Sequence, residues 1–155
     1  MDYFKILRSH LGHQKIILNC AGVVIEWDGK ILLQNRSDKL GWGLVGGLLE
    51  LDETYAQAAL REAWEETGLE VHLDSFLGIF HNHSMVWANG DQAHTIGAYF
   101  VASIVKGEPR IEEESLELRF FGENELPPLF AKDHQEAVKA YFAGVRLPLL
   151  TENKA

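Results

Sequence analysis

Three glutamates stand close together in a segment suited to form a helix. Residues 53–66 contain no Gly or Pro and are rich in Ala, Leu and Glu, which favours helix formation. Glu62, Glu65 and Glu66 are spaced i, i+3 and i+4, so their carboxylates share one sector of the helix. Such carboxylates repel one another, and a divalent cation relieves the repulsion; oxygen ligands suit Mg²⁺ or Mn²⁺ better than Zn²⁺. The spacing indicates a metal site, and for the bare motif a solvated acidic face is the alternative.

The opposite side of this helix is expected to face the core. Ala56, Leu60, Ala63 and Trp64 lie on the nearly opposite side of the helical wheel from the glutamates. We expect this apolar side to dock on a sheet and the three carboxylates to lie on the far side.

The remaining segments predict that sheet. Strands are expected over residues 15–27, 30–34, 70–80, 93–105 and 115–121. Asp28-Gly29 makes a hairpin turn between the first two strands, and residues 37–47, with four glycines, are expected to form a loop. Helices are expected over 2–11 and, with Asp133 as the N-cap, over 134–143. This order predicts an α/β fold with a mixed sheet and helices on its faces.

Composition limits the classes of function. The chain has 155 residues, which suits one domain over 1–155, since domains commonly run to roughly 100–200 residues. A net charge of −9 disfavours polymeric nucleic acid and anionic membranes as partners. The single cysteine, Cys20, excludes an internal disulfide. With no targeting signal and no apolar run of membrane-spanning length in the sequence, we expect a cytoplasmic protein.

The segment from Gly47 to Leu69, GLLELDETYAQAALREAWEETGL, resembles the Nudix box of the Nudix hydrolases. It has the family's Gly, Glu, Arg-Glu, Glu-Glu and Gly at the family's spacing. Two positions depart from the pattern. Ala63 stands where a larger aliphatic residue is usual, and Val45 replaces a Pro that many members have before Gly46-Gly47. All the acidic positions are present.

The resemblance implies an α/β/α sandwich and Mg²⁺-dependent hydrolysis, with Mn²⁺ as an alternative metal, of a nucleoside diphosphate linked to a group X. By matching position, Glu62, Glu65 and Glu66 would be metal-binding carboxylates, and any one of them could also serve as the base. Glu53 and Arg61 would be the pair that orients them, and Gly47 would present a backbone carbonyl near the metal. ADP-ribose, nucleotide sugars, nucleoside triphosphates, dinucleoside polyphosphates and capped RNA ends are all open as substrates.

Several other residues are candidates for substrate or metal contacts. Family members often add an acidic residue from beyond the box; Glu112, Glu113, Glu114, Glu117 and Asp91 are available, and we favour the 112–117 group. Arg36 is a candidate phosphate contact or a surface charge. Trp42 and Trp87 are candidates for stacking on a base or for core packing. His81 and His83 share a face of a strand and suit either a metal or phosphate contact or an ordinary surface.

An alternative of another class is a nucleotide-binding sensor that uses the fold without turnover. Such a protein would be expected to lack one or more of the box carboxylates, and this chain keeps them all. The sequence leaves monomer and homodimer equally open, with a small nucleotide as the expected partner.

Overall fold

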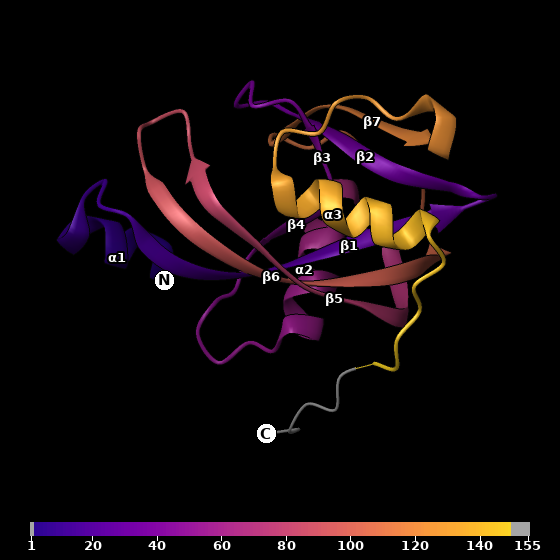
Figure 1. The fold of residues 1–155 in the computed structure, drawn as a ribbon, viewed down its shortest axis with the longest axis horizontal. Helices are drawn as coiled ribbons and strands as arrows, with labels where there is room; N and C mark the ends of the chain where they lie inside the picture. The colour runs from indigo at the N-terminus through magenta and orange to yellow at the C-terminus, as the bar shows by residue number, and fades with distance from the viewer. Residues whose placement is uncertain (1, 150–155) are drawn as a thin grey trace.

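The computed structural model describes residues 2–149. The elements, in chain order, are α1 (Tyr3–Leu11), β1 (Ile16–Trp27), β2 (Lys30–Arg36), β3 (Trp42–Gly43), β4 (Val45–Leu48), α2 (Tyr55–Thr67), β5 (Glu70–Val86), β6 (Gln92–Lys106), β7 (Ser115–Phe121), the 3₁₀ turn η1 (Glu123–Glu125) and α3 (Lys132–Phe142). Figure 1 shows their arrangement.

Strand β1 is the centre of a seven-stranded mixed sheet with the path β3-β2-β1-β6-β5. It pairs in parallel with β6 along most of its length, from Ile16 to Glu26. Its other edge pairs antiparallel first with β4 and then with β2, and β7 pairs with β2. The predicted mixed α/β sheet is confirmed. Its parallel pair is β1 and β6, and the chain between these two strands includes α2 and β5, as the crossover connection between parallel strands requires.

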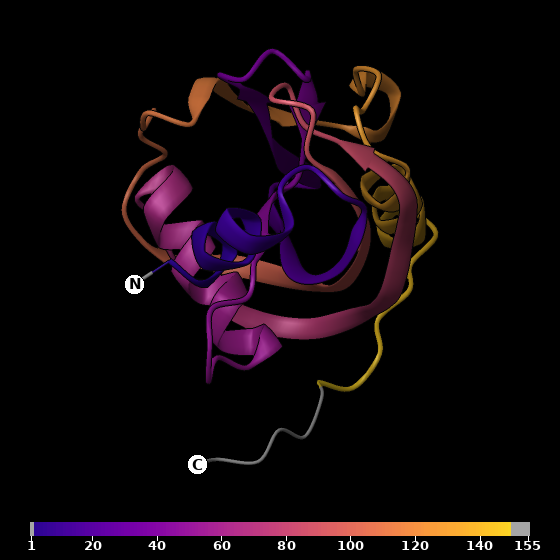
Figure 2. The same ribbon diagram turned by 90° about the vertical axis from the view of Figure 1, so that its left-hand side faces the viewer.

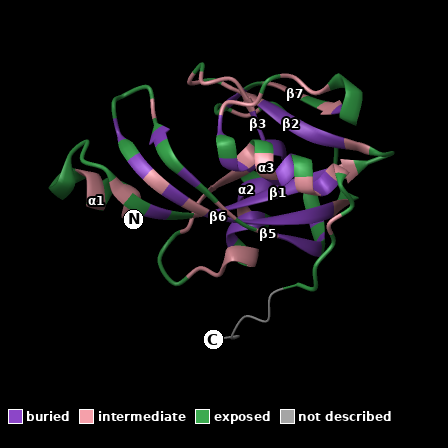
Figure 3. Cartoon of the chain, in the orientation of Figure 1, coloured by how far each residue is buried: buried purple, intermediate pink, exposed green. Residues whose placement is uncertain are grey.

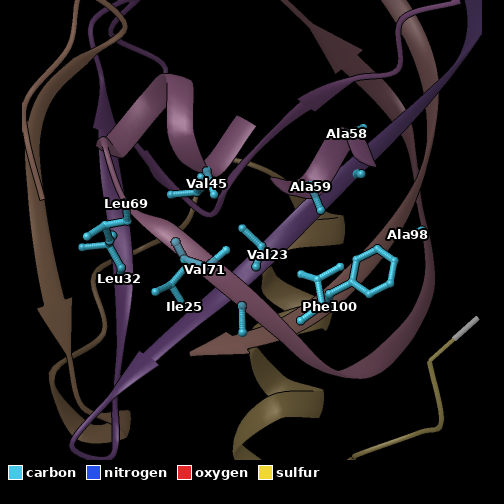
Figure 4. Close-up of a cluster of buried hydrophobic side chains, with 14 of the residues drawn as sticks. Val23, Ile25, Leu32, Val45, Ala58, Ala59, Leu69, Val71, Ala98 and Phe100 are labelled. Atoms are coloured by element: carbon cyan, nitrogen blue, oxygen red, sulfur yellow. The ribbon is translucent and has the colours of Figure 1, made fainter. Parts of the chain in front are cut away.

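Helices cover both faces of the sheet. Helix α2 packs over the cluster that contains Val23, Ile25 and Phe100, to which it contributes Ala58 and Ala59; Figure 4 shows these side chains. Helix α3 packs on the other face over a second buried cluster that includes Val24, Leu33 and Tyr99. Figure 2 shows α2 and α3 on opposite sides of the curved strands, and Figure 3 shows the central strands as the most deeply buried part.

The end of the β5–β6 hairpin extends beyond these layers and lies near α1 (Figure 1). A third cluster joins them, in which Phe4 and Leu7 of α1 pack with Leu18 and Met85. Arg8 of α1 also donates hydrogen bonds to the carbonyl oxygens of Gln14 and Gln92. The first helix is thereby attached to the hairpin.

Two local predictions were wrong. Residues 42–43 and 45–48 within the glycine-rich segment are strands rather than loop, because β4 completes the edge of β1 with Gly46 opposite Gly22. Asp133 does not cap α3: the N-cap is Ala131, and the Asp133 side chain instead accepts a hydrogen bond from the Tyr99 hydroxyl at 2.5 Å.

Among residues 2–149, no helix has the length and apolar character needed to cross a lipid bilayer.

Candidate active site

Helix α2 has clear start and stop signals. Thr54 caps its N-terminus, where the Thr54 side chain accepts from the backbone of Gln57 and the Gln57 side chain accepts from the backbone of Thr54. Gly68 ends the helix in the left-handed conformation, which glycine adopts readily. These two caps fix where the helix begins and ends, and they thereby fix where its glutamates lie relative to the sheet.

The orientation of α2 about its axis corrects the sequence prediction. Glu62 and Glu66 lie on the same side as the buried Ala59 and Ala63, and are only 9% and 2% exposed. Trp64, expected in the core, is instead 55% exposed, and Leu60 is 40% exposed. The small alanines let the helix approach the sheet closely, and two carboxylates are thereby carried into the interior.

A compact cluster of three carboxylates results. Potential ligand oxygens of Glu62, Glu66 and Glu114 all lie within 4.8 Å of one another. Glu66 Oε1 accepts a long hydrogen bond from the Gly46 backbone N–H at 3.4 Å. Its other oxygen, Oε2, is buried and makes no hydrogen bond within residues 2–149. An acceptor that is buried without a partner is costly, and a cation at this point would satisfy it.

The electrostatics of the cluster favour a cation. Burial, followed by the close approach and charge of Glu62 and by the charge of Glu114, raises the pKa of Glu66 well above its ordinary value. Burial and then the charge of Glu62 likewise raise the pKa of Glu114. Both pKa shifts come first from burial and then from repulsion between the carboxylates. The cluster therefore either retains protons or takes up positive charge.

Arg61 holds the neighbouring carboxylates in place. Its Nε and one terminal nitrogen donate to the two oxygens of Glu53, at 2.6 and 3.0 Å. The other terminal nitrogen donates to Glu62 at 2.8 Å and to Glu65 at 3.1 Å. A further hydrogen bond to the Leu48 carbonyl oxygen, 3.0 Å long, ties the guanidinium to the end of β4. Among these carboxylates Glu65 is the most open, with a side chain 54% exposed.

Gly46 and Gly47 let β4 pass between the helix and β1. A β-carbon at Gly46 would lie 2.4 Å from the Ala21 carbonyl oxygen, and one at Gly47 would lie 2.3 Å from Glu62 Oε1. Neither position has room for a side chain. The backbone of β4 is therefore in direct contact with the carboxylates of α2.

An open cleft of about 410 Å³ lies over this arrangement. The predicted site residues that line it are Gly47, Arg61, Glu62, Glu65, Arg36 and Glu114. Arg36 is held at the wall by a 2.6 Å ion pair with Asp38 and lies over the Phe130 ring. Glu53 stands behind Arg61, and Glu66 lies beneath Glu62 in the buried part of the cluster.

Glu112 and Glu113 do not line the cleft, and neither do Glu117, Asp91 and Trp42. Glu117 pairs with Arg119 on the exposed surface of β7. Asp91 holds the hairpin end together, accepting from His13 and Asn89. Trp42 packs edge-on against Phe121, with ring centroids 5.0 Å apart. In each of these three cases the side chain instead contacts a neighbouring residue outside the cleft.

Apart from Trp87, the other side of the cleft comes from residues that the sequence did not single out for this role. Tyr99, Asp133 and His134 line it, together with Trp87 and Phe130. Asp133 Oδ1 is buried and makes no hydrogen bond within residues 2–149. The Tyr99–Asp133 contact joins β6 to α3 across 34 positions of sequence, and no local pattern signals it. Trp87, which was considered for base stacking, does face the cleft.

The fold and this site define a class of protein, and comparison with known proteins agrees. The family described as NUDIX domain matches residues 18–141. The chain therefore belongs to the Nudix family, whose members are hydrolases that act on phosphoanhydride bonds.

Individual relatives are consistent with this assignment. The chain is 36% identical over 121 residues to an ADP-ribose pyrophosphatase of Methanocaldococcus jannaschii, covering 76% of this chain and 69% of that protein. It is 46% identical over 65 residues to a MutT-like protein of Streptomyces ambofaciens, covering 42% of each. The fold resembles that of a NUDIX hydrolase from Nitrosomonas europaea with a TM-score of 0.72 at 24% identity, over 88% of this chain and 97% of that one.

Proposed function

We propose that this protein hydrolyses the diphosphate bond of a small nucleoside diphosphate linked to a group X, with Mg²⁺ as the cofactor and Mn²⁺ as an alternative. The observation that carries the proposal is the carboxylate cluster at the cleft, in which Glu66 Oε2 is buried without a hydrogen bond beside Glu62 and Glu114. A cation held at this point, at the wall of the cleft, is what metal-assisted hydrolysis of a diphosphate requires.

The residues present fit a hard divalent cation. Carboxylate oxygens are the donors that Mg²⁺ prefers, and Glu62, Glu66 and Glu114 supply them in one place. Glu65 and the Gly47 carbonyl complete the proposed set. When bound, Mg²⁺ would neutralise phosphate oxygens and make a water molecule a stronger nucleophile.

The chain's own groups would position the reaction. Arg61 fixes Glu62 and Glu65 through hydrogen bonds to both, so that one of the box carboxylates can accept the proton of the attacking water. Arg36, on the cleft wall, would contact a phosphate of the substrate. Its guanidinium carries the positive charge that an anionic substrate needs in an otherwise acidic cleft.

The far side of the cleft suits a nucleobase. Trp87 and Phe130 offer aromatic surface at the cleft. The unpaired Asp133 Oδ1 can accept from an N–H group on the edge of a base. ADP-ribose is the first substrate to test, for two reasons. One relative is named ADP-ribose pyrophosphatase, and the amino group of adenine is a suitable donor for Asp133 Oδ1.

The experiment is hydrolysis of ADP-ribose, nucleotide sugars, dinucleoside polyphosphates and nucleoside triphosphates with Mg²⁺, with Mn²⁺ and with EDTA. We expect metal-dependent release of a nucleoside monophosphate from one class, and AMP plus ribose 5-phosphate if that class is ADP-ribose. Glu62→Gln and Glu66→Gln should each lower it about 10²-fold or more. Glu117→Gln is the matched control, because Glu117 is a glutamate outside the cleft.

The same measurements distinguish the sensor alternative. Tight nucleotide binding with no turnover in either metal would support a sensor and overturn the hydrolase. Full activity of both cluster variants would overturn the assignment of the metal site.

A further inference from the structure

Three histidines meet on the β5–β6 hairpin, away from the carboxylates. His81 and His83 are two residues apart on β5, and His94 faces them from β6. His81 Nδ1 lies 2.9 Å from His94 Nε2. The ring centroids of His83 and His94 are 4.3 Å apart, and those of His81 and His83 are 5.6 Å apart and nearly parallel. One nitrogen from each ring lies within 4.8 Å of the others.

This cluster occupies the opposite face of the hairpin from the cleft. Side chains alternate between the faces of a strand, and Thr95, next to His94, lines the cleft. On β5, Asn82 between the two histidines is buried, whereas His81 and His83 are exposed. The imidazoles therefore face solvent and do not contact the substrate cleft. Figure 1 shows the hairpin extending away from α2, which carries the glutamates.

An ordinary structural role does not account for the cluster. Histidines that serve a structural role are commonly paired with a carboxylate, as His13 is with Asp91 and His72 is with Asp74. No ion pair within residues 2–149 involves His81, His83 or His94. The three rings instead contact one another, so that any protonated ring would repel the next.

The dimensions fit a tetrahedral metal ion. Zn²⁺ binds imidazole nitrogen at roughly 2.0–2.1 Å, so two nitrogens on one tetrahedral ion lie about 3.3 Å apart. The 2.9 Å contact is close to that spacing, and rotation of exposed side chains can bring the third nitrogen inward from within 4.8 Å. Neutral imidazole suits Zn²⁺ far better than Mg²⁺.

We propose that His81, His83 and His94 bind one Zn²⁺ ion, with a fourth coordination position open to solvent. The ion would link β5 to β6 next to the register shift between Asn82 and Met85. Met85 of β5, Thr95 of β6 and Trp87, which follows β5 directly, line the cleft. Zinc would therefore fasten the hairpin that forms one wall of the substrate cleft, without taking part in the chemistry there.

The test is Zn²⁺ binding to the full, untagged chain in millimolar Mg²⁺, measured by competition with a chromophoric chelator. We expect one Zn²⁺ per chain. Each of His81→Ala, His83→Ala and His94→Ala should weaken Zn²⁺ binding about tenfold or more. Even residues that only hydrogen-bond to a metal ligand typically change metal affinity by about that factor when mutated. His72→Ala, another exposed histidine of β5, should bind like the parent.

Cobalt gives an independent readout. Co²⁺ at a tetrahedral site with nitrogen ligands absorbs visible light strongly, whereas octahedral Co²⁺ among carboxylates absorbs weakly. We expect the strong bands in the parent and in Glu66→Gln, and their loss in His81→Ala. Unchanged zinc affinity in the triple histidine variant, or equal bands in parent and His81→Ala, would overturn the site. Hydrolysis in Mg²⁺ should be unaffected by the histidine changes, so this result is separate from the proposed function.

Discussion

Gly47 and Glu62 are in direct contact: a β-carbon at position 47 would lie 2.3 Å from Glu62 Oε1 and 2.5 Å from its carboxyl carbon. The contact joins β4 to α2 at the centre of the carboxylate cluster. Because Glu62 is also held by Arg61 at 2.8 Å, its carboxylate has little freedom to move aside. The absence of a side chain at Gly47 thus sets the position of a proposed metal ligand.

Gly47→Ala should accordingly damage activity more than folding. The added methyl group must displace the Glu62 carboxylate, and we expect hydrolysis to fall about 10²-fold, since a misplacement near 1 Å can cost that much. Overpacking of this kind costs about 1–3 kcal/mol in the free energy of unfolding. The measurements are kcat/KM and urea unfolding.

Gly29→Ala serves as the matched control for this prediction. Gly29 has φ +73 and open space around it, so alanine there strains the backbone by about 1–2 kcal/mol far from the cleft. We expect a comparable loss of stability with normal hydrolysis. Equal activity in the two variants would contradict the proposed role of Gly47.

Glu66→Gln should separate catalysis from stability. The amide keeps the shape of the side chain but removes a charge that burial and Glu62 oppose. We expect hydrolysis to fall about 10²-fold or more, as for loss of a group that acts on the reacting centre. The free energy of unfolding in EDTA should not decrease, because no favourable charge pair is lost. A variant that is inactive only because it unfolds would contradict this prediction.

Arg61→Lys should loosen the carboxylates. Lysine retains the charge but cannot donate to both Glu53 oxygens while also reaching Glu62, Glu65 and the Leu48 carbonyl oxygen. We expect a loss of about 1–3 kcal/mol in the free energy of unfolding, typical of hydrogen bonds to charged groups. Hydrolysis should fall at least about tenfold. Arg119→Lys loses an exposed pairing with Glu117 and ring contacts with Trp42 and Phe121, so we expect a smaller loss of stability and unchanged hydrolysis.

The sequence predicted the family because the motif depends on local spacing. The capped helix over Tyr55–Thr67 and the contact between Glu53 and Arg61 follow from positions within one short segment. Glu114, one of the favoured acidic group, reaches the cluster through the pairing of β7 with β2. Which of residues 112–117 reaches the cluster depends on the register of that pairing, and the sequence does not show the register.

The rotation of α2 was mispredicted for a physical reason. Helical wheels assume that apolar side chains face inward, but here Trp64 is exposed while Glu66 is buried. The proposed metal site would account for this reversal, because its ligands must be carried into the interior. Tyr99 and Asp133 were likewise unpredictable as a pair, since only the packing of α3 on β6 brings them together.

His134 provides a prediction for pH. Its Nδ1 accepts the Leu44 backbone N–H at 3.0 Å, which requires that nitrogen to be unprotonated. Burial lowers the pKa of His134 below its ordinary value. The negative charge of Asp133 opposes this shift, and the positive charge of Arg36 adds to it. Between the ordinary and the lowered pKa, the unfolded chain binds a proton that the folded chain does not. This contribution to stability is therefore present above about pH 6.5 and is lost as the pH falls.

His134→Asn should reduce that dependence, because the amide oxygen can accept from Leu44 without titrating. We expect the free energy of unfolding of the parent to fall between pH 7.5 and 5.5, and that of the variant to fall less. Urea unfolding in EDTA at several pH values measures the difference. His10→Asn, at an exposed position of α1, should leave the slope of the parent nearly unchanged. If His134→Asn steepened the loss of stability at low pH, the imidazole would have to be protonated in the folded protein, and its contact with Leu44 would need another explanation.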